Sequence, residues 1–302
     1  MRRTVACLVI LLGAAGLVAR AQQIFRAGVD LVHFGVVVTD KHGAPILGLK
    51  AEDFEIIEEG TRQKLQFFAG GEPASAPPLH LGFMIDNSGS MIKDIADVRT
   101  AAIKFLNRVE NITDVTVADF DTEVRVARFG PDDFPRLIER IRSRKPDGYT
   151  ALYDALGVYL NGASHQTGDK ILVLYTDGGD TRSAIRQSEL LDLLKVSDVT
   201  VYSIGYLQHQ GSGRAEQQQI LERFAATTGG QAFFPTSVDE LDKMYDKILR
   251  EISGRYSLGY VSSNPKMDGQ WRDVKVRIVN RPELKNAKIR TRAGYYAPYK
   301  PS

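Results

Sequence analysis

Five small oxygen-bearing side chains stand beside apolar runs of the sequence, and their types and spacing suit metal chemistry. Asp86, Ser88 and Ser90 form a D-x-S-x-S pattern directly after the apolar run that ends at residue 85. Asp177 follows a second apolar run, and Thr150 opens a segment with helical spacing. Ligands of a parallel sheet bind beyond the carboxyl ends of its strands. If the apolar runs are such strands, the five side chains gather at one edge of the sheet.

A ligand set made only of oxygen atoms suits a hard cation. Two carboxylates and three hydroxyls fit Mg²⁺ or Mn²⁺ in near-octahedral geometry better than a carboxylate-rich Ca²⁺ site. The two formal charges only just neutralise a divalent ion, and hydroxyl ligands donate weakly. The ion would therefore stay electrophilic and could accept one more oxygen from outside. The expected cofactor is Mg²⁺ or Mn²⁺, and the natural additional ligand is an Asp or Glu carboxylate of a partner protein.

The first of these segments also allows simpler interpretations. Ser88 could cap the helix expected after it, since serine is a favoured N-cap residue, but that role leaves Asp86, Thr150 and Asp177 unexplained. Asp94 and Asp97 could form a second cation site. They could equally be solvated acids in the first turns of the helix, where negative charge complements the helix dipole.

Other acids near the expected sheet edge have open roles as well. Asp154 and Asp180 are either outer partners of the ligands or surface acids. Asp119 and Asp121 flank Phe120 at the end of an expected strand, where a turn role is favoured over metal ligation. A basic cluster follows, and we expect a solvated helix face there, with an acidic partner or a membrane surface as the alternative: Arg136, Arg140, Arg142, Arg144 and Lys145.

Enzymatic interpretations lack their required residues. A phosphoryl-accepting aspartate at position 86 would call for a second acid two residues later, where the sequence has Ser88. A serine hydrolase would need G-x-S-x-G, but Asp86 stands where glycine is required. No histidine lies in the three segments, and no G-x-G-x-x-G follows the first strand of the expected sheet. We therefore expect a binding protein, with a metal-using hydrolase as the least favoured class.

The composition narrows the remaining classes. The chain has 302 residues, of which 43% are hydrophobic and 25% charged, as in ordinary globular proteins of about two domains. Lys and Arg number 39 against 37 Asp and Glu, for a net charge of +2, which argues against a nucleic-acid binder. The chain has one cysteine and five histidines without paired spacing, which argues against a Cys/His zinc site and against a disulfide framework.

The N-terminus has the three parts of a signal peptide in order. Arg2 and Arg3 precede the apolar run Val5–Val18, and Ala19-Arg20-Ala21 has a cleavable small-x-small pattern. The run suits a signal peptide and is short for a membrane span of about 20 residues. We expect cleavage after Ala21 and export to the periplasm, the cell surface or the medium, with no membrane span in the mature chain.

The central part of the chain alternates strand and helix patterns. Near-continuous apolar runs at 79–85, 115–120, 171–176 and 199–204 are typical of parallel strands buried on both faces. Helical spacing between them includes a first helix expected to bury Ile92 and Ile95. Residues 123–129 alternate and predict an antiparallel edge strand. The predicted fold class is α/β, with a doubly wound, mostly parallel sheet over 79–253.

The flanks have β character, and six strands are expected at 29–39, 54–58, 65–68, 256–261, 271–278 and 288–292. Each flank is close to ~40 residues, too few for a separate core without disulfides or metal. We therefore expect one small antiparallel β-sandwich, interrupted by the α/β domain. The predicted boundaries are 1–21 signal peptide, 22–69 first β part, 70–78 linker, 79–253 α/β domain, 254–298 second β part and 299–302 tail.

The five site residues resemble the metal-ion-dependent adhesion site of von Willebrand factor type A domains. The D-x-S-x-S pattern, the single threonine Thr150 and the aspartate of Thr176-Asp177-Gly178 occur in the expected order. Both flanks are similar to secreted bacterial VWFA-related proteins of the acidobacterial type. This second resemblance rests on Val38-Thr39-Asp40, Gly43, Gly48-Leu49, Asp53-Phe54, Tyr256-Ser257-Leu258-Gly259-Tyr260 and Arg292-Ala293-Gly294-Tyr295-Tyr296. The interrupted β-sandwich resembles the layout of integrin β subunits.

This resemblance implies an exported, metal-dependent adhesion module that captures a partner carboxylate. The alternative is a structural or assembly scaffold whose A domain binds partners through metal-independent surfaces.

Overall fold

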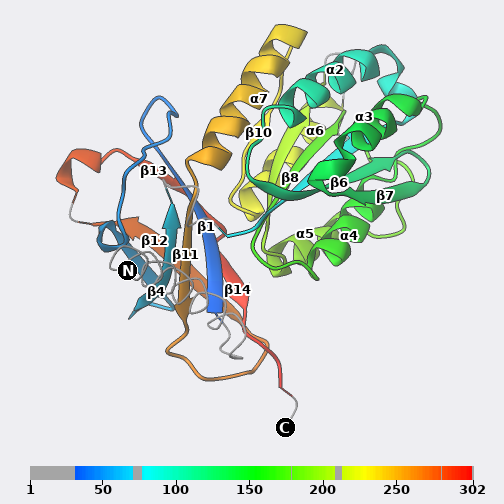
Figure 1. Ribbon diagram of the computed structural model, residues 1–302. Coiled ribbons are helices and arrows are strands. Elements are labelled where there is room, and N and C mark those ends of the chain that lie inside the picture. The colour runs from blue at the N-terminus through cyan, green and yellow to red at the C-terminus, as the bar shows by residue number, and fades with distance from the viewer. Residues whose placement is uncertain (1–30, 71–76, 178, 208–212, 280, 301–302) are drawn as a thin grey trace, which may run out of the picture.

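The computed structural model describes residues 31–70, 77–177, 179–207, 213–279 and 281–300. The expected signal peptide lies outside these residues. Within them, no helix is both long and apolar enough to cross a membrane. Figure 1 shows an α/β unit, residues 79–253, beside a β unit built from residues 31–70 and 256–296.

The α/β unit is a six-stranded sheet between two layers of helices. The sheet has the order β10-β9-β8-β5-β6-β7, and only β7 runs antiparallel to its neighbour. The strands are β5 Leu79–Asp86, β6 Ile112–Phe120, β7 Val124–Phe129, β8 Asp169–Thr176, β9 Val199–Gly205 and β10 Ala232–Phe233. The predicted fold class and the antiparallel edge strand are confirmed.

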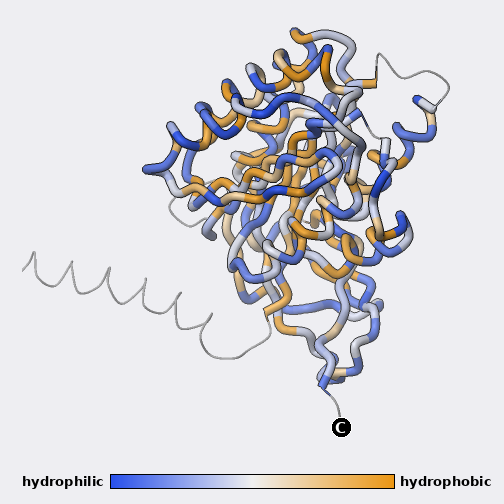
Figure 2. Tube along the Cα trace, turned by 90° about the vertical axis from the view of Figure 1, so that its right-hand side faces the viewer, coloured by the Kyte–Doolittle hydropathy of each residue, from blue (hydrophilic) through white to orange (hydrophobic). Residues whose placement is uncertain are grey.

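Three helices cover each face of this sheet, because alternate residues of its strands are apolar on both sides. Phe83 and Ile85 pack with α2 Ile95–Leu106, α3 Phe134–Ser143 and α7 Val238–Ser253. Met84 and Ala118 pack with α4 Leu152–Ala163, α5 Gln187–Val196 and α6 Arg214–Thr227. Figure 2 shows the hydrophobic strands inside and the mixed helices outside. Ile92 is 63% exposed in the 3₁₀ turn η3 Gly89–Lys93, so the prediction that it is buried is wrong, because the α-helix begins only at Ile95.

The β unit contains two four-stranded antiparallel sheets, and each sheet combines strands from both flanks of the chain. One has the order β13-β1-β11-β4 and the other β14-β12-β2-β3. Their strands are β1 Leu31–Thr39, β2 Phe54–Glu58, β3 Thr61–Gln63, β4 Leu65–Gly70, β11 Tyr256–Val261, β12 Trp271–Ile278, β13 Lys288–Arg290 and β14 Gly294–Tyr296. The 3₁₀ turns η1 Ala51–Asp53 and η5 Pro282–Leu284 belong to this unit, whereas η4 Pro131–Asp133 lies before α3 in the α/β unit. The two sheets share a core that includes Phe34, Ile56 and Tyr260.

Buried polar contacts join the two units. The Ser257 hydroxyl donates to Asp169 over 2.6 Å, and Arg255 Nη2 donates to the Thr200 hydroxyl over 2.8 Å. Glu251, fully buried at the end of α7, forms an ion pair with Arg290 of β13. Only Gly254 and Arg255 separate α7 from β11. The α/β unit is therefore held to the β unit by directed polar contacts as well as by the chain.

Candidate functional site

Three loops meet at the carboxyl edge of the parallel sheet and carry the five predicted site residues. Asp86 ends β5, Asp177 directly follows β8, and Thr150 lies just before α4. Backbone hydrogen bonds join the loop of Asp86 to the loop of Thr150, since Gly89 N–H donates to Gly148 O over 3.1 Å and Asp147 N–H donates to Asn87 O over 2.9 Å. The parallel topology thus places all three loops at the edge that the sequence analysis predicts.

Asp86 is buried and its carboxylate orders its own loop. Oδ1 accepts the backbone N–H of Ser88 over 2.9 Å, and Oδ2 accepts the Thr176 hydroxyl over 2.6 Å. The hydroxyls of Ser88 and Ser90 lie 3.0 Å apart and share a hydrogen bond. Ser88 precedes η3 but its side chain forms no capping hydrogen bond. The simpler role of Ser88 as a helix cap is therefore not what the structure shows.

The two carboxylates of the set influence each other electrostatically. Burial, and then the charge of Asp177, raise the pKa of Asp86 to about 7, although hydrogen bonds from Ser88 and Thr176 oppose the shift. No lysine, arginine or histidine in the described part of the chain forms an ion pair with either carboxylate. Buried negative charge without a cationic partner is costly, so this pair favours the approach of a cation.

Thr150 is held in place by its backbone, which leaves its side chain available. Its N–H donates to the Thr181 hydroxyl over 3.0 Å, and its carbonyl accepts the N–H of Thr181 over 2.9 Å. The residue is 5% exposed, and its own hydroxyl forms no hydrogen bond within the residues that the structure describes. The loop after Asp177 thus holds the loop of Thr150 in place.

The five candidate residues could coordinate a hard cation only if their hydroxyl oxygens serve as ligands beside the carboxylates. Among the described residues, no three His, Cys, Asp or Glu side chains cluster closely enough to hold a metal ion. The five candidates offer only two carboxylates, Asp86 and Asp177, so serine and threonine oxygens must complete any coordination. This mixture of charged and neutral oxygen donors fits Mg²⁺ or Mn²⁺.

The neighbouring acids Asp154 and Asp180 have structural partners. Asp154 accepts the N–H groups of Ala184 and Ile185, over 2.9 and 3.1 Å. Asp180 accepts the N–H of Tyr153 over 3.2 Å and the Ser183 hydroxyl over 2.6 Å. Together they fasten the loop after Asp177 onto the start of α4, and so fix the position of Thr150 indirectly.

The basic cluster is a solvated face only in part: Arg136, Arg142 and Lys145 are exposed as expected, but Arg140 and Arg144 are not. Arg140 and Arg144 turn inward and form ion pairs with buried Asp119, over 2.5 and 3.1 Å. Arg125 adds a third ion pair to Asp119 and also binds Asp121 over 3.0 Å. Asp121 accepts the N–H of Glu123 in the turn before β7. Asp121 therefore has the turn role that we expected. Asp119 instead pairs with Arg140 and Arg144, which the sequence pattern predicted to be solvated.

Sequence reasoning missed the residues that support the site from behind. Thr176 donates to Asp86, and Thr181 binds the backbone of Thr150. Arg99 Nη2 donates to Asn87 Oδ1 over 2.7 Å, which ties α2 to the loop of Asp86. Thr176 could have been found, since it precedes Asp177 and ends a strand adjacent to β5. Arg99 could not have been found from the local sequence pattern, because its partner Asn87 lies in a loop outside its helix.

Comparison with known proteins identifies the family. The protein-family model of the von Willebrand factor type A domain matches residues 80–247. This range is more than half of the chain and includes all five site residues. The chain belongs to the von Willebrand factor type A family. No curated protein matches its sequence significantly.

Two solved structures of low sequence identity, an Mfa5 domain and SpaC, share this fold, and the PilB structure is also similar. The vWF domain of the type V pili tip protein Mfa5 from Porphyromonas gingivalis is 14% identical, with 59% of this chain and 95% of that chain covered and a TM-score of 0.51. The pilus adhesin SpaC from Lactobacillus rhamnosus GG is 11% identical, with 82% and 48% covered and a TM-score of 0.50. The PilB minor pilin from Streptococcus sanguinis is 18% identical, with 59% and 62% covered and a TM-score of 0.46. This von Willebrand factor type A chain thus spans less than two thirds of PilB and of SpaC.

Proposed function

We propose that this protein is exported and binds a partner protein through a divalent cation, Mg²⁺ or Mn²⁺, without catalysing a reaction. Asp86, Ser88, Ser90, Thr150 and Asp177 would hold the ion directly or through water. When bound, the ion supplies an electrophilic position for a carboxylate of the partner. The observation that carries the proposal is the pair of buried carboxylates, Asp86 and Asp177, which have no cationic partner among the described residues and lie on loops that meet the loop of Thr150.

Two exposed apolar side chains beside the site support a protein as the partner. Ile92 and Tyr149 are 63% and 64% exposed. They lie on the two loops joined by the hydrogen bond between Gly89 and Gly148. Large exposed apolar and aromatic groups commonly anchor protein interfaces. The pilus adhesin and pili tip protein that share this fold bear names consistent with such a role.

Metal-dependent stabilisation tests the site. A ligand that binds only the folded state raises its stability by about 2.7 kcal/mol at a hundredfold excess over the dissociation constant. Millimolar Mg²⁺ or Mn²⁺ should therefore raise the melting temperature of residues 22–302. Asp86→Ala should abolish that rise, because it removes a buried carboxylate ligand. Asp132→Ala, at an exposed acid of η4, is the matched control and should retain it. An equal metal response in Asp86→Ala and wild type would rule out the site.

Partner binding separates the metal-dependent role from the scaffold alternative. For any identified partner, excess chelator and either Thr150→Ala or Asp177→Ala should abolish binding, while circular dichroism shows an intact fold. Undiminished binding by these variants would instead favour an assembly module that uses metal-independent surfaces.

A further inference from the structure

A second candidate site lies between the two units, at the opposite end of the parallel sheet. A cleft of about 830 Å³ is lined by α4, α5, β1, the segment 261–267 and the segment 292–298. Lys170 and Val199 reach it from the starts of β8 and β9, whereas the candidate metal site lies where the parallel strands end. Its volume falls in the range of about 300–1,000 Å³ usual for small-molecule sites, which often form at domain interfaces.

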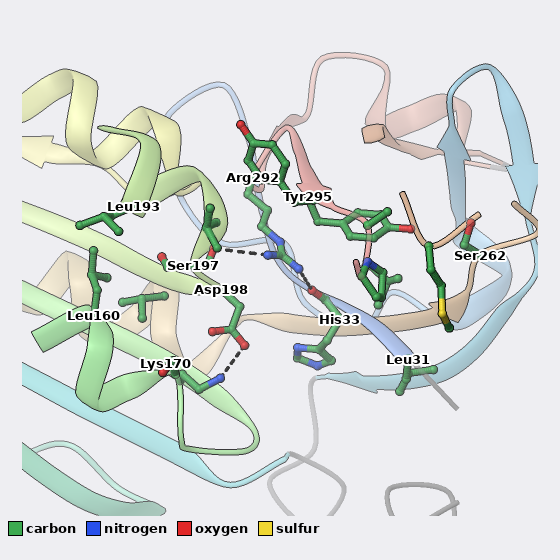
Figure 3. Close-up of a pocket in the computed structure, with 18 of the residues that line it drawn as sticks. Leu31, His33, Leu160, Lys170, Leu193, Ser197, Asp198, Ser262, Arg292 and Tyr295 are labelled. Atoms are coloured by element: carbon green, nitrogen blue, oxygen red, sulfur yellow. Dashed lines mark hydrogen bonds and ion pairs between the residues drawn. The ribbon is translucent and has the colours of Figure 1, made fainter. Parts of the chain in front are cut away.

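Large apolar side chains form much of the cleft wall, beside polar ones such as Asn161 and Gln166. Figure 3 shows Leu160 and Leu193 on one side, and Leu31 and Tyr295 on the other. Three further wall or rim side chains are large, apolar and unusually exposed for their type: Val196 at 61%, Met267 at 46% and Tyr296 at 39%. Covering apolar surface of this kind is favourable at about 25 cal/mol per Å². The walls therefore suit a ligand with a hydrocarbon portion.

The charged groups of the cleft are unbalanced. Its lining has three cationic side chains, Lys170, Lys266 and Arg292, and one carboxylate, Asp198, which pairs with Lys170 over 2.5 Å. Burial lowers the pKa of His33, although the Asp169 charge opposes the shift, so the imidazole adds no positive charge at neutral pH. The lining thus keeps a surplus of positive charge.

Arg292 is the cation best placed to receive an anionic group. Its guanidinium donates to His33 O over 2.8 Å and to Ser197 O over 3.3 Å, and it lies 4.7 Å from the centre of the Phe34 ring. Both acceptors are neutral carbonyls, and within the described residues Arg292 forms no ion pair with a carboxylate; the nearby charge of Asp198 is itself paired with Lys170. Figure 3 shows this fixed guanidinium between the two walls. A guanidinium held in one orientation is well suited to bind a carboxylate.

We propose that this cleft binds an amphipathic carboxylate, with the carboxylate against Arg292 and the hydrocarbon chain along the apolar walls. The proposal is independent of the metal site, because it uses different residues at the other end of the sheet.

Displacement of a fluorescent fatty acid tests the proposal. A dansyl-labelled undecanoic acid should bind residues 22–302 saturably at one site. Unlabelled decanoate should displace it, and decanol should need at least about tenfold higher concentration because it lacks the charge. Equal displacement by decanol, or no saturable binding, would overturn the proposal.

A matched pair of variants locates the probe. Val196→Glu places a negative charge on the wall of the cleft and should weaken probe binding at least about tenfold. Leu47→Glu introduces the same charge at an equally exposed residue outside the cleft, 62% against 61%, and should bind as wild type does. Equal affinity of the two variants would overturn the assignment. Both should keep the Mg²⁺ response of the melting temperature, so the outcome is separable from that of the metal site.

Discussion

Asp53 and Arg281 form a two-point ion pair between the first and second flanks of the chain. Arg281 Nε donates to Oδ1 over 2.9 Å and Nη2 donates to Oδ2 over 3.2 Å, and the Lys50 N–H donates to Oδ2 over 2.8 Å. The hydrogen bonds from Arg281, and then that from Lys50, lower the pKa of Asp53 below its ordinary value. The ionised form of this carboxyl group is therefore favoured in the folded protein.

This shift predicts a stability difference that depends on pH. Because the folded pKa is lowered, the contribution of Asp53 is fully present above the unfolded value of about 3.9 and is lost as the pH falls through the folded value. Wild type should be more stable than Asp53→Asn at neutral pH, and the difference should shrink in acid. Urea denaturation across a pH series measures it. A difference that stays constant into acid would contradict the assignment, and Asp132→Asn should show none.

Glu58 shows why some residues could not be placed from the sequence. The stretch Phe54-Glu55-Ile56-Ile57-Glu58 alternates, and the sequence correctly predicts a half-buried strand there. Its buried face, however, carries Glu58, which is 1% exposed. The Glu58 carboxylate accepts hydrogen bonds from the hydroxyls of Tyr260, Ser262 and Tyr295. These partners lie more than 200 residues away in the chain. A buried carboxylate is acceptable only with such hydrogen bonds, and local pattern cannot reveal them.

At the scale of elements, α4 packs closely against β5, the strand that ends at Asp86 of the candidate site. Gly82 lies in the centre of β5, and a Cβ atom there would stand 2.1 Å from the Tyr159 hydroxyl oxygen and 2.3 Å from Cζ of its ring. Tyr159 is buried in the same core as Met84. The absence of a side chain at Gly82 therefore allows α4 to pack closely on the sheet.

Gly82→Ala should destabilise the protein by about 1–3 kcal/mol, the usual cost of overpacking a core. In the Tyr159→Leu background the same substitution should cost less, because the ring that it meets is gone. Gly162→Ala, on the same helix with nothing within 4 Å of its added Cβ, should be neutral or stabilising. Thermal or urea denaturation measures all four variants. Equal costs of Gly82→Ala in both backgrounds would contradict this packing account.

The sequence predicted elements best where one physical signal dominates. The parallel strands are buried on both faces, so their apolar runs alone predict them, and Asp86 and Asp177 lie where two of these strands end. β3 and β14 have three residues each, too few for a periodic pattern to detect. The inward turn of Arg140 and Arg144 also escaped prediction, because it depends on Asp119 of another element.

At the scale of the whole molecule, the second flank supplies the inner strand of one β sheet and a central strand of the other. β11 lies between β1 and β4, and β12 lies between β14 and β2. Without residues 255–302, β1 and β4 would have no strand between them, and of the first flank's strands only β2 and β3 would still pair with each other. A lone two-stranded hairpin is at best marginally stable in water.

This arrangement predicts the behaviour of fragments. Residues 77–254 should fold alone and keep the Mg²⁺ response, because both faces of their sheet are covered by their own helices. Residues 22–76 alone should show the narrow amide proton dispersion of an unfolded chain. They should gain the dispersion of a folded protein when a short linker joins them to 255–302, since that restores β11 and β12 beside their partners. A well-dispersed spectrum from 22–76 alone would show that the first flank folds independently, and the β unit would then be two separate parts.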